Sequence, residues 1–383
     1  MRILVAPDSF KGSLSALGAA QAMARGILSV FPDASVTRLP IADGGEGTVE
    51  ALVAATGGEL RSATVTGPMG APVTAVWGIL GDGLTAVIEM AAASGLPLVH
   101  PEVRDPRKAT SFGTGELMRA ALDLGLRRMI LGLGGSASND GGAGMAQALG
   151  ARFLDRNGRP LPRGGGALAR LERIDLGPLD PRLAQCAILA ACDVDNPLCG
   201  PNGASAVFGP QKGASAPVVA QLDAALDHFS RLATQVTGRE VANQPGAGAA
   251  GGLGAGLLYF TGARLRPGIE IVLEAVGFSD RMATTDLVVT GEGRTDAQTA
   301  MGKAPLGVAR AAAPFGVPVV CLSGALAPGS EALLDQGLAA LMAIVPGPMT
   351  LEACMNSAAE LTEAAAARMC RLLRVGAGVV PPR

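Results

Sequence analysis

The sequence predicts an α/β protein with two domains, and three features of the chain lead to that prediction. Short apolar runs alternate with polar loops and helix-like segments at both ends of the chain, a rhythm typical of a parallel sheet. In between, residues 60–66, 72–80 and 84–90 are rich in Val, Thr and Ile and are separated by glycine turns, which predicts antiparallel strands. The length of 383 residues suggests two or three domains.

The pattern of apolar residues predicts further elements along the chain. The other strands that we expect are at 2–6, 35–41, 129–133, 151–155, 186–191, 287–290, 317–322 and 338–345. The helices that we expect are at 17–31, 48–55, 111–124, 143–149, 218–236, 267–276, after 303, between 322 and 338, and at 351–373. Residues 246–256, rich in Gly and Ala, predict a tightly packed segment near a ligand rather than a linker.

The two ends of the chain share a strand–loop–helix style that the middle lacks. The simplest domain organisation is a discontinuous domain formed by 1–66 and 281–383. An inserted α/β domain with a mixed sheet then occupies 67–280.

Composition narrows the functional class. Hydrophobic residues make up 49% of the chain, charged residues 17% and aromatic residues 3%, and the net charge is −2. A nucleic-acid-binding protein would more often have a basic face or stacking aromatic residues. The N-terminus is unlike a signal peptide, and the uncharged stretches 241–263 and 311–330 contain too many glycines or prolines for membrane helices. Six cysteines lack a CxxC pair, which indicates free thiols in a cytoplasmic protein.

A strand, a glycine turn and a polar helix start follow one another within residues 127–145, RRMILGLGGSASNDGGAGM. Glycine allows the backbone to approach a phosphate, and the N–H groups that begin a helix attract anions. On its own this stretch is equally compatible with a capped strand-to-helix turn.

Charged residues gather in six glycine-containing loops beside predicted strands. These loops hold carboxylates and cations together, the groups that phosphoryl transfer requires, because carboxylates bind Mg²⁺ or accept a proton and cations neutralise developing charge. The charged residues are Asp8, Asp43, Glu46, Asp140, Asp193, Asp195, Glu292, Asp296, Lys11, Lys212, Arg294 and Lys303. Of the four lysines in the chain, three have a glycine neighbour, a good setting for a phosphate contact.

Several catalytic classes lack their motifs here. There is no GxxxxGK[ST], HRD, DFG, HExxH or GxSxG motif. The two histidines, His100 and His228, lie outside the glycine loops, so any general base is expected to be a carboxylate.

Six long motifs together resemble the bacterial glycerate kinase family. In chain order they are APDSFKGSLSA (6–16), PIADGGEGT (40–48), GLGGSASNDGG (132–142), CDVDNPLCGPNGASAVFGPQKGA (192–214), NQPGAGAAGGLGAGL (243–257) and TGEGRTDAQTAMGKAP (290–305). The resemblance implies ATP-dependent phosphorylation of D-glycerate to 2-phosphoglycerate with Mg²⁺. It also implies two α/β domains, one of them flavodoxin-like, with the active site in the cleft between them.

The resemblance leaves individual roles open, and we assign them from residue type. Lys11, Asp43 and Asp193 are the catalytic candidates, with Asp43 accepting the hydroxyl proton. For ATP phosphates the candidates are Gly134, Gly135, Ser136, Asn139 and Lys303. Mg²⁺ would be held by Asp193 and Asp296, and the glycerate carboxylate by Arg294 with Thr295, or by Ser9.

Other functions remain open at this level. Phosphorylation of the 3-hydroxyl would use the same residue types. GLGGSAS also resembles the phosphate loop of the galactokinase–mevalonate kinase group, whose fold and N-terminal region differ. A non-catalytic sugar-acid binder would suit two α/β lobes, but the crowded acidic and basic loops favour an enzyme.

Overall fold

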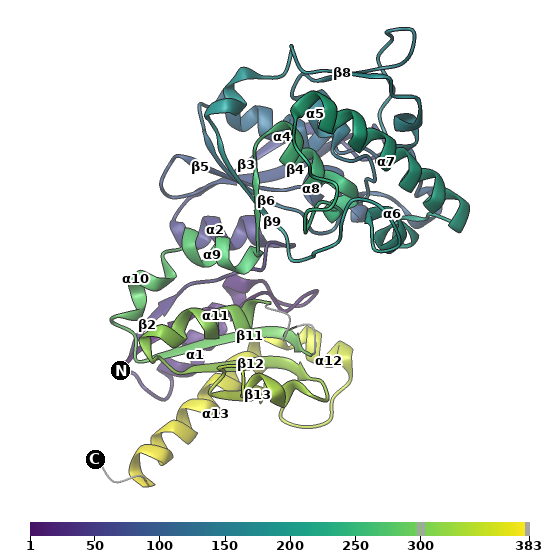
Figure 1. The fold of residues 1–383 in the computed structure, drawn as a ribbon. Helices are drawn as coiled ribbons and strands as arrows, with labels where there is room; N and C mark the ends of the chain where they lie inside the picture. The colour runs from purple at the N-terminus through teal and green to yellow at the C-terminus, as the bar shows by residue number, and fades with distance from the viewer. Residues whose placement is uncertain (297–298, 300–302, 380–383) are drawn as a thin grey trace. The chain divides into compact units, whose positions relative to one another are not determined.

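The computed structural model describes residues 1–296, 299 and 303–379, and the chain divides into two compact units (Figure 1). The smaller unit consists of Met1–Asp43, Glu50–Gly57 and Ile269–Arg383. The larger unit consists of Gly44–Val49 and Gly58–Gly268. The chain therefore leaves the smaller unit and returns to it, as a discontinuous domain does.

The smaller unit is built on a five-stranded parallel sheet in the order β13-β12-β11-β1-β2. Its strands are β1 (Arg2–Val5), β2 (Ser35–Arg38), β11 (Leu287–Thr295), β12 (Val319–Leu326) and β13 (Ala340–Ala343). Numbered along this unit alone, the order is 2-1-3-4-5, which is the flavodoxin-like arrangement. The expectation of a flavodoxin-like parallel sheet is thereby confirmed.

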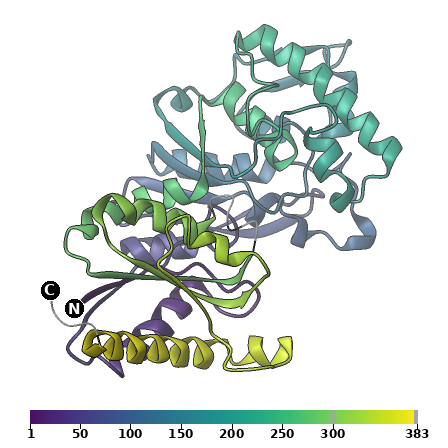
Figure 2. The ribbon, with the colours of Figure 1, turned by 60° about the horizontal axis from the view of Figure 1, so that its bottom comes forward.

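Helices cover both faces of this sheet. The helices lying wholly or mostly in this unit are α1 (Ala16–Leu28), α2 (Thr48–Thr56), α9 (Gly268–Ala275), α10 (Phe278–Met282), α11 (Ala304–Ala312), α12 (Leu351–Asn356) and α13 (Ala358–Val379). Alternate strand residues, such as Ile3, Val289 and Leu322, form one core with α1 and α13, while α11 lies over the other face (Figure 2). At Gly26 of α1 an added Cβ would lie 2.1 Å from the Glu363 carbonyl oxygen, so the two helices pack backbone against backbone.

The larger unit contains a six-stranded mixed sheet in the order β10-β9-β6-β5-β4-β3. The strands are β3 (Glu59–Thr66), β4 (Pro72–Ile79), β5 (Thr85–Glu89), β6 (Arg128–Gly132), β9 (Ala187–Ala191) and β10 (Arg264–Arg266). β3, β4 and β5 pair antiparallel, whereas β5, β6, β9 and β10 pair parallel. The predicted meander and the mixed sheet are both confirmed.

A second core in this unit is formed by helices and a small hairpin. These elements are α5 (Ala143–Ala148), α6 (Ala204–Phe208), α7 (Ala216–Thr237), α8 (Ala249–Phe260) and the strands β7 (Arg152–Leu154) and β8 (Arg173–Asp175). The helices α3 (Ala91–Ser94) and α4 (Phe112–Asp123) pack instead in the core of the six-stranded sheet. Phe153, Phe229, Tyr259 and Phe260 pack there with ring centroids 5.8–6.2 Å apart. Four of the protein's eleven aromatic residues therefore pack together at this point.

Four features differ from the sequence-based expectations. β3 pairs along its whole length with β4, so residues 58–66 belong to the larger unit and not to the 1–66 segment, and the return to the smaller unit comes near 269 instead of 281. The helix expected between 322 and 338 is only the 3₁₀ turn Ser330–Leu333, because β12 continues to Leu326 and Pro328 and Gly329 follow. The final helix is interrupted at Ser357.

The fourth difference concerns β11, which runs on to Thr295 because it keeps pairing with β12 as far as Leu326. Glu292, Arg294 and Thr295 therefore lie on a strand rather than in a loop. Across the parts of the chain that are described, no helix is both long and apolar enough to cross a membrane.

Candidate active site

The segment that follows β1 lies beside the second half of β11, at the carboxyl end of the parallel sheet. The Asp8 backbone N–H donates to the Gly291 carbonyl at 2.9 Å, and the Ser9 N–H donates to the Asp8 carboxylate at 2.6 Å. An added Cβ at Gly293 would lie only 3.2 Å from the backbone nitrogen of Lys11. Ligands of open α/β sheets bind at this edge, and two of the predicted site residues, Ser9 and Lys11, are on it.

The Asp8 carboxyl is the most perturbed acid of this edge. Burial is the main cause that raises its pKa to about 7, and the negative charges of Asp43 and Glu292 act in the same direction. Asp43, the predicted base, is thus close enough to Asp8 for their charges to interact. A carboxyl group with a strongly raised pKa at a strand end is a candidate functional group, and Asp8 was not among the residues to which we assigned a role.

Glu292 anchors a buried polar network at the same edge. Its Oε1 accepts hydrogen bonds from the hydroxyls of Thr295 and Thr299, each at 2.8 Å. The Thr295 hydroxyl also lies 2.6 Å from the Ser323 hydroxyl on β12. Burial raises the pKa of Glu292, while the threonine donors and the charge of Lys303 oppose that rise.

The four predicted site residues of this segment, Arg294, Thr295, Asp296 and Lys303, differ in how exposed their side chains are. Thr295 is fully buried and its hydroxyl is committed to Glu292 and Ser323, so the side chain faces the protein interior rather than a substrate. Arg294 is exposed and lies 3.5 Å from Asp296 in an ion pair. Lys303 immediately precedes α11, and the glycine before it, Gly302, lies outside the described residues.

In the larger unit, the predicted phosphate loop follows β6. Gly134 and Gly135 are exposed, and Gly135 has a φ of +73°, which favours glycine. Ser136 and Asn139 are buried. The exposed backbone of the two glycines is therefore the part of this loop that a ligand can reach directly.

Asp140 occupies the start of the helix that follows. Its carboxylate accepts hydrogen bonds from the backbone N–H groups of Gly142 and Gly144, at 3.2 and 3.3 Å. The Ser111 N–H and hydroxyl also donate to it, at 2.8 and 3.0 Å. Burial raises the pKa of this carboxyl, and these donors oppose the rise. The backbone N–H groups at the start of α5 thus bind a carboxylate of the protein itself, as in the capped strand-to-helix turn that was one of the two alternatives for this stretch.

A cation reaches the glycine loop from a distant motif. The Lys212 ammonium donates to the Ser136 hydroxyl at 2.8 Å and to the Ser138 carbonyl at 2.6 Å. The Asn139 amide nitrogen donates to the Ser205 hydroxyl at 2.9 Å. The loop 134–142 contains no lysine or arginine of its own, so the amino group that contacts it comes from a motif about 70 residues later in the chain.

Asp193 follows β9 and is exposed. Its carboxylate accepts a hydrogen bond from the Gly268 N–H at 2.8 Å. Asp193 belongs to the larger unit and Asp296, its predicted partner in metal binding, to the smaller one. Neither unit by itself brings this pair together.

Within the described ranges, no group of three or more His, Cys, Asp or Glu side chains is arranged to hold a metal ion. Mg²⁺ in phosphoryl-transfer sites is usually bound through one or two carboxylates, with substrate phosphates and water completing its shell. The accessible carboxylates of Asp193 and Asp296 fit that mode of binding.

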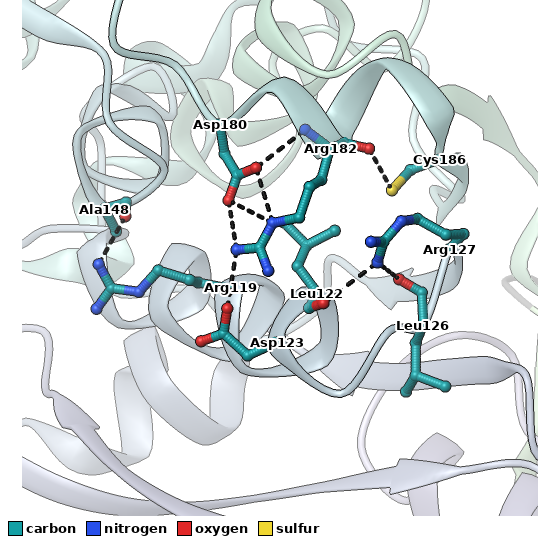
Figure 3. Close-up of polar contacts among 9 residues, drawn as sticks. All are labelled: Arg119, Leu122, Asp123, Leu126, Arg127, Ala148, Asp180, Arg182 and Cys186. Atoms are coloured by element: carbon teal, nitrogen blue, oxygen red, sulfur yellow. Dashed lines mark hydrogen bonds and ion pairs between the residues drawn. The ribbon is translucent and has the colours of Figure 1, made fainter.

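Arg119 and Arg182, which line a surface cavity of about 450 Å³, and the nearby Arg127 have a structural role (Figure 3). Arg119 donates to the Ala148 carbonyl at the end of α5, and Arg127 donates to the Leu122 and Leu126 carbonyls near the end of α4. Arg182 pairs with Asp180 and Asp123. Because these arginines bind helix-terminal carbonyls or carboxylates of the protein, we do not assign the active site to this cavity.

Sequence reasoning gave no role to three of the residues that organise these sites: Asp8, Glu292 and Lys212. Each belongs to one of the charged loops, but residue type alone did not separate them from their neighbours. What distinguishes them is burial together with specific partners, which depends on the fold. Lys212 had one visible signal, because lysine is rare in this chain and glycine follows it.

Comparison with known proteins identifies the family. Residues 3–374 match the model of the glycerate kinase family. A glycerate kinase of Bacillus subtilis is 55% identical over 95% of this chain and 95% of its own length. A glycerate 2-kinase of Escherichia coli is 49% identical over 98% of this chain and 99% of its own.

A solved structure described as glycerate kinase 2 from Salmonella typhimurium LT2 has the same fold. It superposes with a TM-score of 0.91 at 48% identity and covers 99% of this chain and 100% of its own. The resemblance drawn from the six sequence motifs is thereby confirmed, and a kinase family implies the use of ATP. The chain belongs to the glycerate kinase family and is an enzyme of that family.

Proposed function

We propose that this enzyme transfers the γ-phosphoryl group of ATP to the 2-hydroxyl of D-glycerate, giving 2-phosphoglycerate and ADP with the help of Mg²⁺. The observation that carries the choice of the 2-hydroxyl is the 49% identity, over nearly the full length of both chains, to the relative named glycerate 2-kinase. The charged residues at the carboxyl end of the flavodoxin-like sheet and the glycine loop supply the chemistry that such a transfer needs. We place the enzyme in the cytoplasm.

The glycine loop would bind the phosphates of ATP. Gly134 and Gly135 offer an exposed backbone. The buried Ser136 is hydrogen-bonded to Lys212, and the buried Asn139 is hydrogen-bonded to Ser205. Lys303 would bind the transferred phosphoryl group together with Lys11, whose side chain is exposed at the sheet edge.

Carboxylates would divide the remaining tasks. Asp43 accepts the proton of the attacking hydroxyl, and its charge already interacts with the neighbouring Asp8. Asp193 and Asp296 would hold Mg²⁺, which when bound neutralises charge on the phosphate oxygens. Asp193 thus joins Lys11 and Asp43 as a catalytic residue.

The glycerate carboxylate needs a cation or a cluster of donors. Arg294 and Ser9 are accessible or partly accessible beside the Asp8 segment. Thr295 supports this site through Glu292 rather than by touching the substrate, given its buried hydroxyl.

An ADP-release assay with D-glycerate, ATP and Mg²⁺ tests the proposal. The wild type should turn over, and Asp43→Asn should lower kcat by about 10²–10⁴-fold because the hydroxyl loses its proton acceptor. Asp33→Asn, an exposed aspartate outside the site, is the matched control and should keep wild-type kcat. Wild-type kcat in Asp43→Asn would exclude Asp43 as the base, and no turnover with D-glycerate would favour a binding protein.

A further inference from the structure

Lys212 is almost completely buried, with 1% of its surface exposed. Lysine side chains are rarely buried to this degree, because desolvating an ammonium group is costly. Its two hydrogen bonds both go to the glycine loop, to the Ser136 hydroxyl and the Ser138 carbonyl. The lysine therefore joins the glycine loop to the motif of 192–214.

A second connection joins the same two segments. The Asn139 side chain donates to Ser205 at 2.9 Å, and Ser205 lies in α6, between Asp193 and Lys212 in the chain. The segment that begins with the predicted metal ligand is thus attached to the glycine loop at two points. A shift of one segment would disturb the other.

Packing alone does not explain a lysine at this position. Burial lowers the pKa of Lys212 to about 7, and the nearby charge of Asp140 only partly opposes this effect. An apolar side chain of similar length would fill the space without the desolvation cost. What an apolar side chain could not do is donate hydrogen bonds to the two acceptors on the glycine loop, as the ammonium group does.

We propose that Lys212 is a positioning residue for ATP, which holds Ser136 and the Ser138 backbone so that the exposed backbone of Gly134 and Gly135 can receive the phosphates. The inference rests on the proposed role of the glycine loop in ATP binding. Lys212 acts through the loop, because its two hydrogen bonds end on loop atoms. Its loss therefore affects the phosphates of ATP more than any other part of either substrate.

The test compares Lys212→Met with Lys108→Met, a matched change of a lysine whose side chain is 75% exposed. In the ADP-release assay, Lys212→Met should raise the KM for ATP at least tenfold and change the KM for D-glycerate less than twofold. Adenosine has no phosphate groups, so its inhibition constant should also stay within twofold. Lys108→Met should leave all three constants unchanged.

A double-mutant cycle with Ser136→Ala tests whether the effect travels through the loop. The effects of the two substitutions on the KM for ATP should be strongly non-additive, because both remove the same hydrogen bond. If Lys212→Met does not fold, Lys212→Leu, which also removes the ammonium donor, takes its place in the cycle. A lowered Tm with an unchanged KM for ATP would contradict the inference and leave Lys212 a purely structural residue.

Gly135→Ala separates this inference from the proposal on which it rests. Gly135 has a left-handed φ that strains any residue with a side chain, and an added Cβ there would lie 3.3 Å from the Ala91 Cβ. The substitution therefore disturbs the loop directly. If Gly135→Ala raises the KM for ATP and Lys212→Met does not, only the role of Lys212 is wrong. If neither variant changes it, the glycine loop is not the ATP site.

Discussion

Three ionisable side chains lie in segments that we connect with phosphoryl transfer: Asp140 and Lys212 are fully buried and Asp8 is half-buried. Each has a pKa displaced by burial in the direction of its neutral form. Each is also held by named partners rather than left alone, as buried polar groups must be. Where hydrogen-bond partners do not offset the desolvation of the ionised form, the group decreases the stability of the folded state, and for Asp8 this cost can be measured.

Asp8→Asn should stabilise the protein at neutral pH. The carboxyl ionises near pH 3.8 when unfolded and near 7 when folded, so the folded state binds more protons in this interval. Stability therefore falls as pH rises from about 4 to 7, and the asparagine variant escapes this loss. The gain in the free energy of unfolding should be near zero at pH 4 and reach at most roughly 4 kcal/mol above pH 7.

Urea denaturation at pH 4.5 and pH 8 measures this gain. Asp33→Asn, which changes an exposed aspartate, serves as the control and should show little change at either pH. An Asp8→Asn variant that is less stable than the wild type at pH 8 would contradict a pKa of Asp8 that is higher in the folded than in the unfolded state.

Asp140→Asn should destabilise the protein strongly. The carboxylate accepts from Ser111, Gly142 and Gly144, and an amide NH₂ would face some of these donors with a donor of its own. The expected loss in the free energy of unfolding is roughly 2–4 kcal/mol. Asp227→Asn removes an exposed ion pair on α7 and should cost less than about 1 kcal/mol; equal losses in the two variants would contradict the assigned role of Asp140.

At the scale of elements, the backbones of the glycine loop and the start of α8 pack closely against each other. Ala250, Gly251 and Gly252 all have left-handed backbone conformations, and the Gly251 carbonyl accepts from the Gly141 N–H at 3.0 Å. An added Cβ at Gly251 would lie 2.1 Å from the Ser138 carbonyl oxygen. The predicted tight packing of 246–256 is confirmed, and what it packs against is the glycine loop.

Gly251→Ala should therefore be far more harmful than Gly262→Ala. Both glycines have nearly the same φ, +67° and +70°, but the nearest atom to an added Cβ at Gly262 is 3.9 Å away. Gly262→Ala should cost only the backbone strain, about 1–2 kcal/mol, and Gly251→Ala at least 2 kcal/mol more through the collision with Ser138. Thermal unfolding of the two variants measures the difference, and similar Tm values would show that the loop can move aside.

Periodicity and turn residues could predict most strands and helices of this chain. They failed where pairing between distant segments decides the outcome. β11 extends to Thr295 because β12 runs beside it, and β3 belongs to the larger unit because β4 pairs with it. No local pattern in 287–295 or 59–66 contains that information.

The same limit applies to the candidate site. The glycine loops and their charged residues could be found from spacing, because phosphate binding requires a permissive backbone and cations. The burial of Thr295, the filling of the α5 start by Asp140 and the approach of Lys212 to Ser136 depend on contacts between motifs far apart in the sequence. Roles that require such contacts could not be assigned from residue type.

At the scale of the whole molecule, two units of different architecture form one kinase. The smaller unit, with the flavodoxin-like sheet, contains Asp8, Asp43, Glu292 and Lys303, and the mixed-sheet unit contains the glycine loop, Asp193 and Lys212. The proposed reaction assigns groups from both units to the two substrates.

One measurement tests the proposed reaction most directly. The enzyme is incubated with D-glycerate, ATP and Mg²⁺, and the phosphorylated product is identified by phosphorus NMR against authentic 2- and 3-phosphoglycerate. We expect the signal of 2-phosphoglycerate to grow in step with ADP. A product that coincides with 3-phosphoglycerate, or ADP formed without either signal, would contradict the proposal.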